Sequence, residues 1–272
     1  MQRRMKALPV LKIKKFCLIT WLTLLGALYL SDHVRMSNCT KWGADKLWGG
    51  DVRCGFSPAV RSLQNGIGGI SVGFEEGVRN GTVFLISPDI VLTAAHLLRE
   101  SKTGEYKKPK EVIFQDDLGR IRRIDVEAVE VGPFKKTISR ARGDWAVLKI
   151  NPLEDRTPIP IGEACEGNLR IAGYAGSTRP RESECKLVEI SAFPYDKSQV
   201  IWTSCDAVNG MSGGPILQES DSGNLRSVGV LSLELDRKPP WSFGPAVTTL
   251  LLDKIKKLSN YPFPSFERCA DS

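Results

Sequence analysis

The sequence predicts an all-β domain that ends in a single amphipathic helix. From about residue 66 onward, short apolar runs rich in β-branched residues alternate with turn-forming residues, a pattern typical of successive short strands. The chain has 272 residues, of which 42% are hydrophobic and 25% are charged. This length and composition provide a hydrophobic core for one large domain or two small ones.

Two hairpins are the most direct signs of antiparallel strands. Residues 87–89 (SPD) separate the apolar runs 82–86 and 90–93. Residues 116–119 (DDLG) separate a second pair of runs. The strands predicted after the first hairpin are 111–115, 120–131, 145–150, 169–173, 185–192, 199–204 and 225–235.

Near the C-terminus the apolar period changes from that of strands to that of a helix. Val247, Leu251, Ile255 and Leu258 recur at intervals of four, four and three, while lysines occupy positions between them. This spacing predicts an amphipathic helix over about 247–258.

The N-terminal segment differs from the rest of the chain in charge and hydropathy. Residues 1–30 hold six of the 38 basic residues and no acidic one, which leaves 32 basic against 31 acidic residues in the remainder. The net charge of +7 therefore belongs mainly to this segment and does not imply nucleic-acid binding. An uncharged apolar run at 16–30 follows the basic residues.

This order of basic and apolar residues predicts an export signal over 1–31, either cleaved or retained as an N-terminal membrane anchor. In both cases the basic end stays in the cytoplasm, and the globular body is expected to be exported to a periplasm or secreted.

Six of the seven cysteines lie beyond the apolar run, and an even number in an exported chain predicts disulfides. The six are Cys39, Cys54, Cys165, Cys185, Cys205 and Cys269. Their spacings are not those of a zinc site, and two histidines are too few for a His-rich metal centre. Residues 32–65 have no sustained periodicity and are interpreted as a tethering extension.

Three short stretches hold residues suited to nucleophilic catalysis. In VLTAAH, His96 follows a β run and two small alanines, and in GDWAVLKI, Asp144 stands at the entrance of a strand. In NGMSGGP, glycines surround Ser212, so the backbone turns tightly and the N–H groups of Gly210 and Ser212 can point at a developing oxyanion. Each stretch alone also suits a structural role.

Taken together, the three stretches point to one constellation. The order His96, Asp144, Ser212, with intervals of 48 and 68 residues, suits a serine activated by an imidazole that a buried carboxylate orients. Ser212 also fits the GxSxG nucleophile elbow of α/β-hydrolases, but there the catalytic histidine follows the serine, and no histidine follows His96. TAAH, GDWAVL and NGMSGGP resemble the three signatures of the chymotrypsin-like serine proteases.

The resemblance covers about residues 66–258 and implies two six-stranded antiparallel β-barrels with the substrate cleft between them. The implied protease domain spans 66–260, with barrel one at about 66–160, barrel two at about 161–250, and a tail at 261–272. His96 and Asp144 would come from the first barrel and Ser212 from the second.

The strand VGVLSLEL resembles the strand that lines the family's cleft. This likeness places Ser232 near Asp144, and it places Leu233 and Glu234 along the edge where an extended peptide would pair by β-strand addition.

Longer phrases, such as GTVFLISPDIVLTAAH, resemble bacterial glutamyl-endopeptidase-like and periplasmic members. A bridge at the positions of Cys185 and Cys205 is common in that group, so the resemblance implies this disulfide. The other four exported cysteines leave three pairings open.

Two positions near the serine bear on specificity and activation. Asp206 lies six residues before Ser212, where trypsin-like enzymes hold the aspartate that receives Arg or Lys, although bacterial relatives also carry Asp there for structural reasons. Met211 occupies the position of the aspartate that pairs with a freed amino terminus in trypsin-like zymogens. Activation by cleavage near Ile67 is therefore not expected.

The resemblance implies a serine endopeptidase that acts on polypeptides and needs no metal or cofactor. Contact with a membrane is expected only through residues 16–30, if they are retained. The alternative is a catalytically silent binding module of the same fold. The three triad residues and the oxyanion glycines favour the enzyme.

Overall fold

The computed structural model describes residues 51–115, 120–133, 142–175, 179–193, 198–235, 241–262 and 266–269. The predicted export segment, Cys39 and the predicted turn at 116–119 lie outside these residues. Within the described ranges, no helix is both long and apolar enough to cross a membrane.

The first six-stranded barrel is closed, as predicted. Its strands follow the order β2-β3-β4-β7-β6-β5, and β5 pairs back with β2. The strands are β2 (Ile67–Phe74), β3 (Gly77–Ser87), β4 (Ile90–Thr93), β5 (Glu111–Gln115), β6 (Ile121–Val131) and β7 (Ala146–Ile150). All four residues of β4 are buried, which explains why this strand reads as a continuous apolar run.

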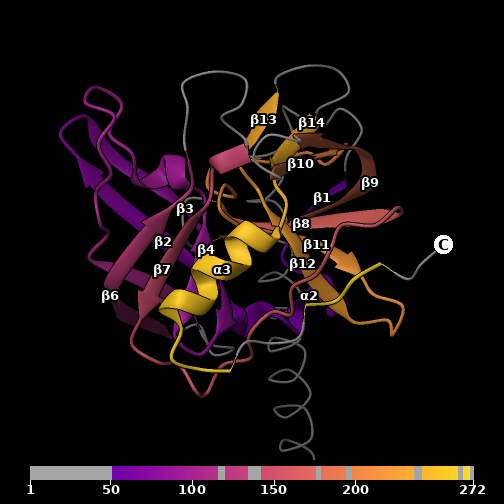
Figure 1. The fold of residues 1–272 in the computed structure, drawn as a ribbon, viewed down its shortest axis with the longest axis horizontal. Coiled ribbons are helices and arrows are strands. Elements are labelled where there is room, and N and C mark those ends of the chain that lie inside the picture. Colours follow the sequence, from indigo (N-terminus) through magenta and orange to yellow (C-terminus); the bar gives the residue numbers. More distant parts are fainter. Residues whose placement is uncertain are drawn as a thin grey trace, which may run out of the picture. The chain divides into compact units, whose positions relative to one another are not determined.

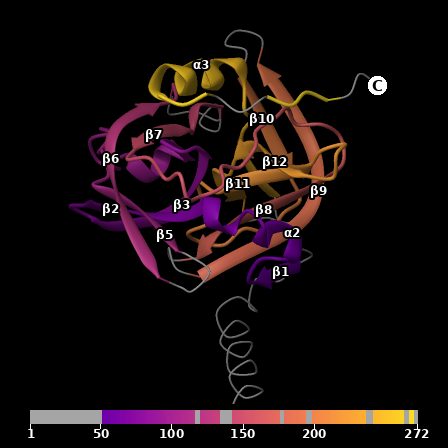
Figure 2. The same cartoon turned by 90° about the horizontal axis from the view of Figure 1, so that it is seen from below.

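The second group of strands forms a curled sheet, which Figure 1 shows to the right of the first barrel. Its order is β12-β11-β8-β9-β10-β14-β13, and β1 pairs separately with β9. The strands are β1 (Asp51–Cys54), β8 (Asn168–Ala175), β9 (Arg179–Phe193), β10 (Ser198–Thr203), β11 (Pro215–Glu219), β12 (Leu225–Val230), β13 (Leu233–Leu235) and β14 (Trp241–Pro245). Figure 2 shows β9 as a long, strongly bent strand of this sheet.

The second sheet differs from the predicted six-stranded barrel in how it closes. A single bridge between Gly229 and Ala246 joins β12 to the end of β14, in place of a continuous ladder. The approach is very close, because a Cβ atom on Gly244 would lie 1.7 Å from the carbonyl oxygen of Val230. The predicted strand 225–235 is correspondingly split, since Ser232 donates its N–H to Phe243 in β14.

The described part of the predicted extension packs on the second sheet. After β1, Ser57 caps the short helix α2 (Pro58–Arg61), and the 3-10 turn η2 (Gln64–Gly66) leads into β2. The buried carboxylate of Glu182 in β9 accepts hydrogen bonds from both the N–H and the hydroxyl of Ser57. Phe56 and Val60 are buried in the core, so residues 51–65 form part of the folded body.

The predicted C-terminal helix is α3 (Thr249–Leu258), which begins two residues later than expected. It buries Leu251 and Ile255, as the spacing predicts, and also Leu252, while Leu258 is half-buried. Lys149 of β7 donates to the carbonyl oxygen of Leu258 and so satisfies one group at the C-terminal end of the helix.

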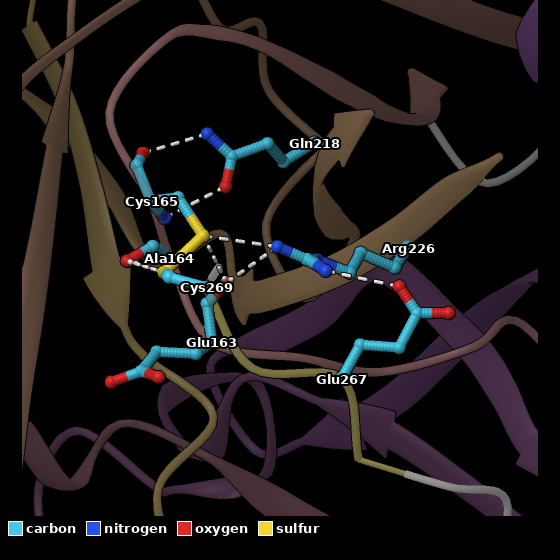
Figure 3. Close-up of a disulfide and its surroundings, with 7 residues drawn as sticks. All are labelled: Glu163, Ala164, Cys165, Gln218, Arg226, Glu267 and Cys269. Atoms are coloured by element: carbon cyan, nitrogen blue, oxygen red, sulfur yellow. Dashed lines mark hydrogen bonds and ion pairs between the residues drawn. A yellow bond between two sulfur atoms is a disulfide. The ribbon is translucent and has the colours of Figure 1, made fainter. Parts of the chain in front are cut away.

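A disulfide between Cys165 and Cys269 ties the chain beyond α3 to the second sheet (Figure 3). The buried guanidinium of Arg226 lies beside it, donating to Glu267, to the carbonyl oxygen of Glu163 and to the sulfur of Cys165. The side chain of Gln218 bonds both the N–H and the carbonyl of Cys165. Of the three pairings left open by the sequence, the structure thus contains Cys165–Cys269.

Candidate active site

His96 lies in the 3-10 turn η3 (Ala95–Leu98), which follows β4 directly. Ala94 and Ala95 are fully buried, so the backbone before the histidine packs tightly against the barrel. The guanidinium of Arg79 in β3 donates to the carbonyl oxygen of His96 over 2.9 Å and stacks 4.8 Å from the ring centroid of Phe74. Nothing in the sequence marks Arg79, because a charged residue near a strand end is usually exposed to solvent.

Asp144 is 1% exposed and contacts His96 in two ways. Its carboxylate oxygens accept the backbone N–H of His96 and pair with the ring Nδ1, each over 2.7 Å. The hydroxyl of Ser232 also donates to the carboxylate. These bonds fix the side chain of Asp144 and the orientation of the imidazole.

Burial by itself raises the pKa of Asp144, but the neighbouring His96 and the hydrogen bonds from His96 and Ser232 outweigh burial. The pKa of Asp144 therefore lies below its ordinary value. Asp144 consequently remains ionised at neutral pH and can stabilise a positive charge that develops on His96.

Ser212 lies in the nucleophile loop, defined here as residues 209–214. Gly210 and Gly213 have positive φ values of 99° and 86°, which favour glycine. A Cβ atom on Gly213 would lie 2.2 Å from both the carbonyl oxygen of Thr82 and the hydroxyl of Thr93. Glycine is therefore favoured at position 210 by backbone conformation, and at position 213 it is required both by backbone conformation and by space.

The Ser212 hydroxyl donates to the carbonyl oxygen of Ser232 over 3.1 Å. Ser232 thus contacts Ser212 through its backbone and Asp144 through its side chain. No direct hydrogen bond joins Ser212 to His96 in the described part of the chain, and such bonds are often loose before substrate binds. The structure nevertheless connects the three predicted triad residues through an unbroken series of contacts.

The remaining predicted site residues are placed as follows. Asp206 is 3% exposed, and its N–H donates to the hydroxyl of Ser183. Leu233 and Glu234 lie in β13, which ends the path of the second sheet and pairs with β14. Their side chains lie outside what the structure describes.

The disulfide expected between Cys185 and Cys205 is present, and it joins β9 to the chain that leads into the nucleophile loop. Within that loop, Met211 donates to Val208 and Gly214 donates to Met211, so local turns hold the backbone. Among the described residues, no group of three or more His, Cys, Asp or Glu side chains is arranged to hold a metal ion.

Similarity to known proteins is found both to a family model and to solved structures. Residues 81–229 match the family model described as trypsin-like peptidase domain. The fold is similar to that of a Glu endopeptidase solved in complex with MPD, with a TM-score of 0.59 and 17% identity over 76% of this chain and 95% of that chain. It is also similar to the active form of the Rv3671c protease from M. tuberculosis, with a TM-score of 0.53 and 19% identity over 76% of this chain and 86% of that chain. No curated protein sequence gives a significant match.

Proposed function

The chain belongs to the trypsin-like peptidase family, whose model spans more than half of it, and we propose that it is a serine endopeptidase acting through an acyl-enzyme at Ser212. Membership of this family makes the protein a peptidase hydrolase with polypeptide substrates. The observation that carries the finer proposal is the pair of 2.7 Å contacts between His96 and the buried Asp144, continued through Ser232 to Ser212.

In the proposed reaction, the Oγ of Ser212 attacks the carbonyl carbon of the scissile bond while the imidazole of His96 takes the hydroxyl proton. The charge on Asp144 stabilises the imidazolium that results. The N–H groups of Gly210 and Ser212 donate to the oxyanion. His96 then passes the proton to the departing amine, and water releases the acyl group by the same route.

Hydrolysis of casein by the purified protein tests this proposal against a binding-only protein of the same fold. An endopeptidase releases peptides at a rate proportional to enzyme concentration. A silent module binds unfolded chains without cutting them. Release of peptides that continues unchanged in Ser212→Ala would point to a contaminating protease.

We further propose that the body is active without cleavage near Ile67. Ile67 is fully buried and its strand continues directly from η2, while Met211 offers no carboxylate to a freed amino terminus. An unpaired buried ammonium would cost several kcal/mol. Chain shown by mass spectrometry to be uncut between residues 51 and 67 should therefore react with a fluorophosphonate probe at once. Reactivity that appears only after cleavage at this point would contradict the proposal.

For specificity we propose a preference for Arg or Lys before the scissile bond, supported by the spacing of Asp206 from Ser212. Replacing Asp206 by serine should lower kcat/KM for such substrates about 10- to 100-fold, because a hydrogen bond to a charged group contributes about 1.5–3 kcal/mol. Cleavage profiles on mixed peptides before and after the substitution provide the measurement. Cuts after other residues that persist unchanged in Asp206→Ser would assign Asp206 a structural role.

We also propose that the body functions outside the cytoplasm, either released or tethered by residues 16–30. The disulfides Cys165–Cys269 and Cys185–Cys205 support this, because such bonds persist in oxidising compartments. Thiol titration of protein unfolded without reductant should find at most one free cysteine, Cys17. If most of the other six cysteines are free in protein isolated from its native compartment, the proposed location is wrong.

A further inference from the structure

Thr82, in β3 of the first barrel, contacts the nucleophile loop through both its backbone and its side chain. Its N–H donates to the carbonyl oxygen of Ser212 over 2.8 Å. Its hydroxyl donates to the carbonyl oxygen of Gly210, also over 2.8 Å, and accepts the N–H of Tyr174 over 2.9 Å. Thr82 is completely buried, so these groups exchange no hydrogen bonds with solvent.

One residue thus holds two carbonyl groups of the loop, two positions apart. The backbone contact to Ser212 is available to any residue with an N–H group. The contact to Gly210 requires a hydroxyl, which at this position only threonine or serine can supply.

The surroundings of Thr82 leave room for this hydroxyl. A Cβ atom on Gly173 would lie 2.7 Å from the Thr82 hydroxyl, and the neighbouring Tyr174 provides the N–H that the hydroxyl accepts. On the other side, Thr93 donates to the Thr82 carbonyl oxygen over 2.7 Å and fixes the peptide that follows. The hydroxyl therefore has one defined orientation, in which its single proton points at Gly210.

Gly210 depends on such an external contact more than another residue would. It lacks a Cβ atom and has a φ of 99°, so rotation of its peptide groups meets little steric resistance. Without the hydroxyl, the buried carbonyl would lose the hydrogen bond that the structure gives it, and rotation toward another partner would be favoured.

We propose that Thr82 is a positioning residue, whose hydroxyl fixes the Gly210–Met211 peptide through the Gly210 carbonyl and so restrains the backbone between the N–H groups of Gly210 and Ser212, which face the oxyanion in the proposed mechanism. This inference rests on the proposed function, in which those N–H groups stabilise the tetrahedral intermediate. Thr82 itself touches no reacting atom.

The variant Thr82→Val tests the proposal, because valine keeps the branched shape of threonine and replaces the hydroxyl with a methyl group, which cannot donate to Gly210. Removing an oxyanion donor outright lowers kcat about 100- to 1000-fold. Loss of the Thr82 hydroxyl, which only positions the backbone that carries the donors, should lower kcat about 10- to 100-fold. KM should stay nearly unchanged, since the effect arises in the transition state. Thr82→Ser keeps the hydroxyl and should retain nearly the wild-type kcat.

A matched control is Thr203→Val, at an equally buried threonine whose hydroxyl accepts the N–H of Cys205 in place of contacting Gly210. Thr203→Val should lower the midpoint of thermal unfolding about as much as Thr82→Val does, but it should leave kcat unchanged. If Thr82→Val does not fold, Thr82→Ala removes the same hydroxyl and leaves space in its place. Wild-type kcat in the hydroxyl-free variant, or an equal loss in Thr82→Ser, would overturn the inference.

A crystal structure of the hydroxyl-free variant separates this inference from the proposed function. We expect the Gly210 carbonyl to turn away from residue 82. An unchanged orientation would refute the role of Thr82 even if the wild-type protein hydrolyses peptides. Absence of hydrolysis by the wild type would refute the proposed function, and the orientation of Gly210 would still decide whether the hydroxyl positions it.

Discussion

Ser212→Ala and His96→Ala are each expected to lower kcat about 10⁶-fold, and the double variant is expected to be no slower than either single variant. The two side chains act as one unit, because the hydroxyl attacks only when the imidazole accepts its proton. Steady-state hydrolysis of a peptide amide, followed over days for the slow variants, provides the comparison.

A suitable control for these variants is Ser227→Ala, at a buried serine whose hydroxyl donates to Gly229 away from the triad. Its kcat should stay within a few-fold of wild type. Losses from Ser212→Ala and His96→Ala that multiply in the double variant would mean that the two residues act independently, contrary to the proposed mechanism.

Asp144→Asn is expected to lower kcat about 10⁴-fold with little change in fold. The amide has nearly the same shape as the carboxylate, but it carries no charge to stabilise the imidazolium. It also favours the wrong tautomer of His96, because its NH₂ group can donate to Nδ1. Hydrolysis rates and thermal unfolding of the same preparation give both quantities.

Asp89→Asn is the matched control for this prediction. Asp89 is also 1% exposed and accepts hydrogen bonds from Ser87, Ser259 and the N–H of Asn260, outside the candidate active site. This variant should be less stable than wild type and retain its kcat. Equal loss of kcat in Asp144→Asn and Asp89→Asn would show that the effect is one of folding.

The strands that were predicted well from the sequence are those that are marked by neighbouring turn residues. β4 and β5 match the predicted bounds residue for residue, because β4 is an apolar run and β5 has an apolar centre, and turn residues lie beside both. β2, β11 and β14 were missed, since their sequences IGGISVGF, PILQE and WSFGP contain glycine or proline. In β2 the glycine is a packing requirement, as a Cβ on Gly68 would lie 2.5 Å from the carbonyl oxygen of Ile113.

The closure of the second sheet could not be predicted from local pattern. Gly244 reads as a strand breaker in the sequence, yet Gly229 and Gly244 together allow the backbones of β12 and β14 to touch. The same crossing splits the predicted strand 225–235 between two partners.

The same distinction applies to the candidate site, where residues in local motifs were predicted and residues that act through distant contacts were not. His96, Asp144 and Ser212 were found because each stands in a short stretch of distinctive composition. Arg79 and Thr82 were not, because their contacts come from the meeting of β3 with η3 and the nucleophile loop. The hydrogen bond from Thr82 to Gly210 joins residues 128 apart, and nothing near Thr82 in the sequence marks it.

The most direct test of the central claim is the site of covalent labelling by a fluorophosphonate probe. We expect peptide mapping of the labelled, folded wild-type protein to find one phosphonylated residue, Ser212. We also expect labelling to be lost in Ser212→Ala and strongly slowed in His96→Ala. Attachment of the probe to a different serine, or equal labelling of wild type and Ser212→Ala, would contradict the assignment of Ser212 as the nucleophile.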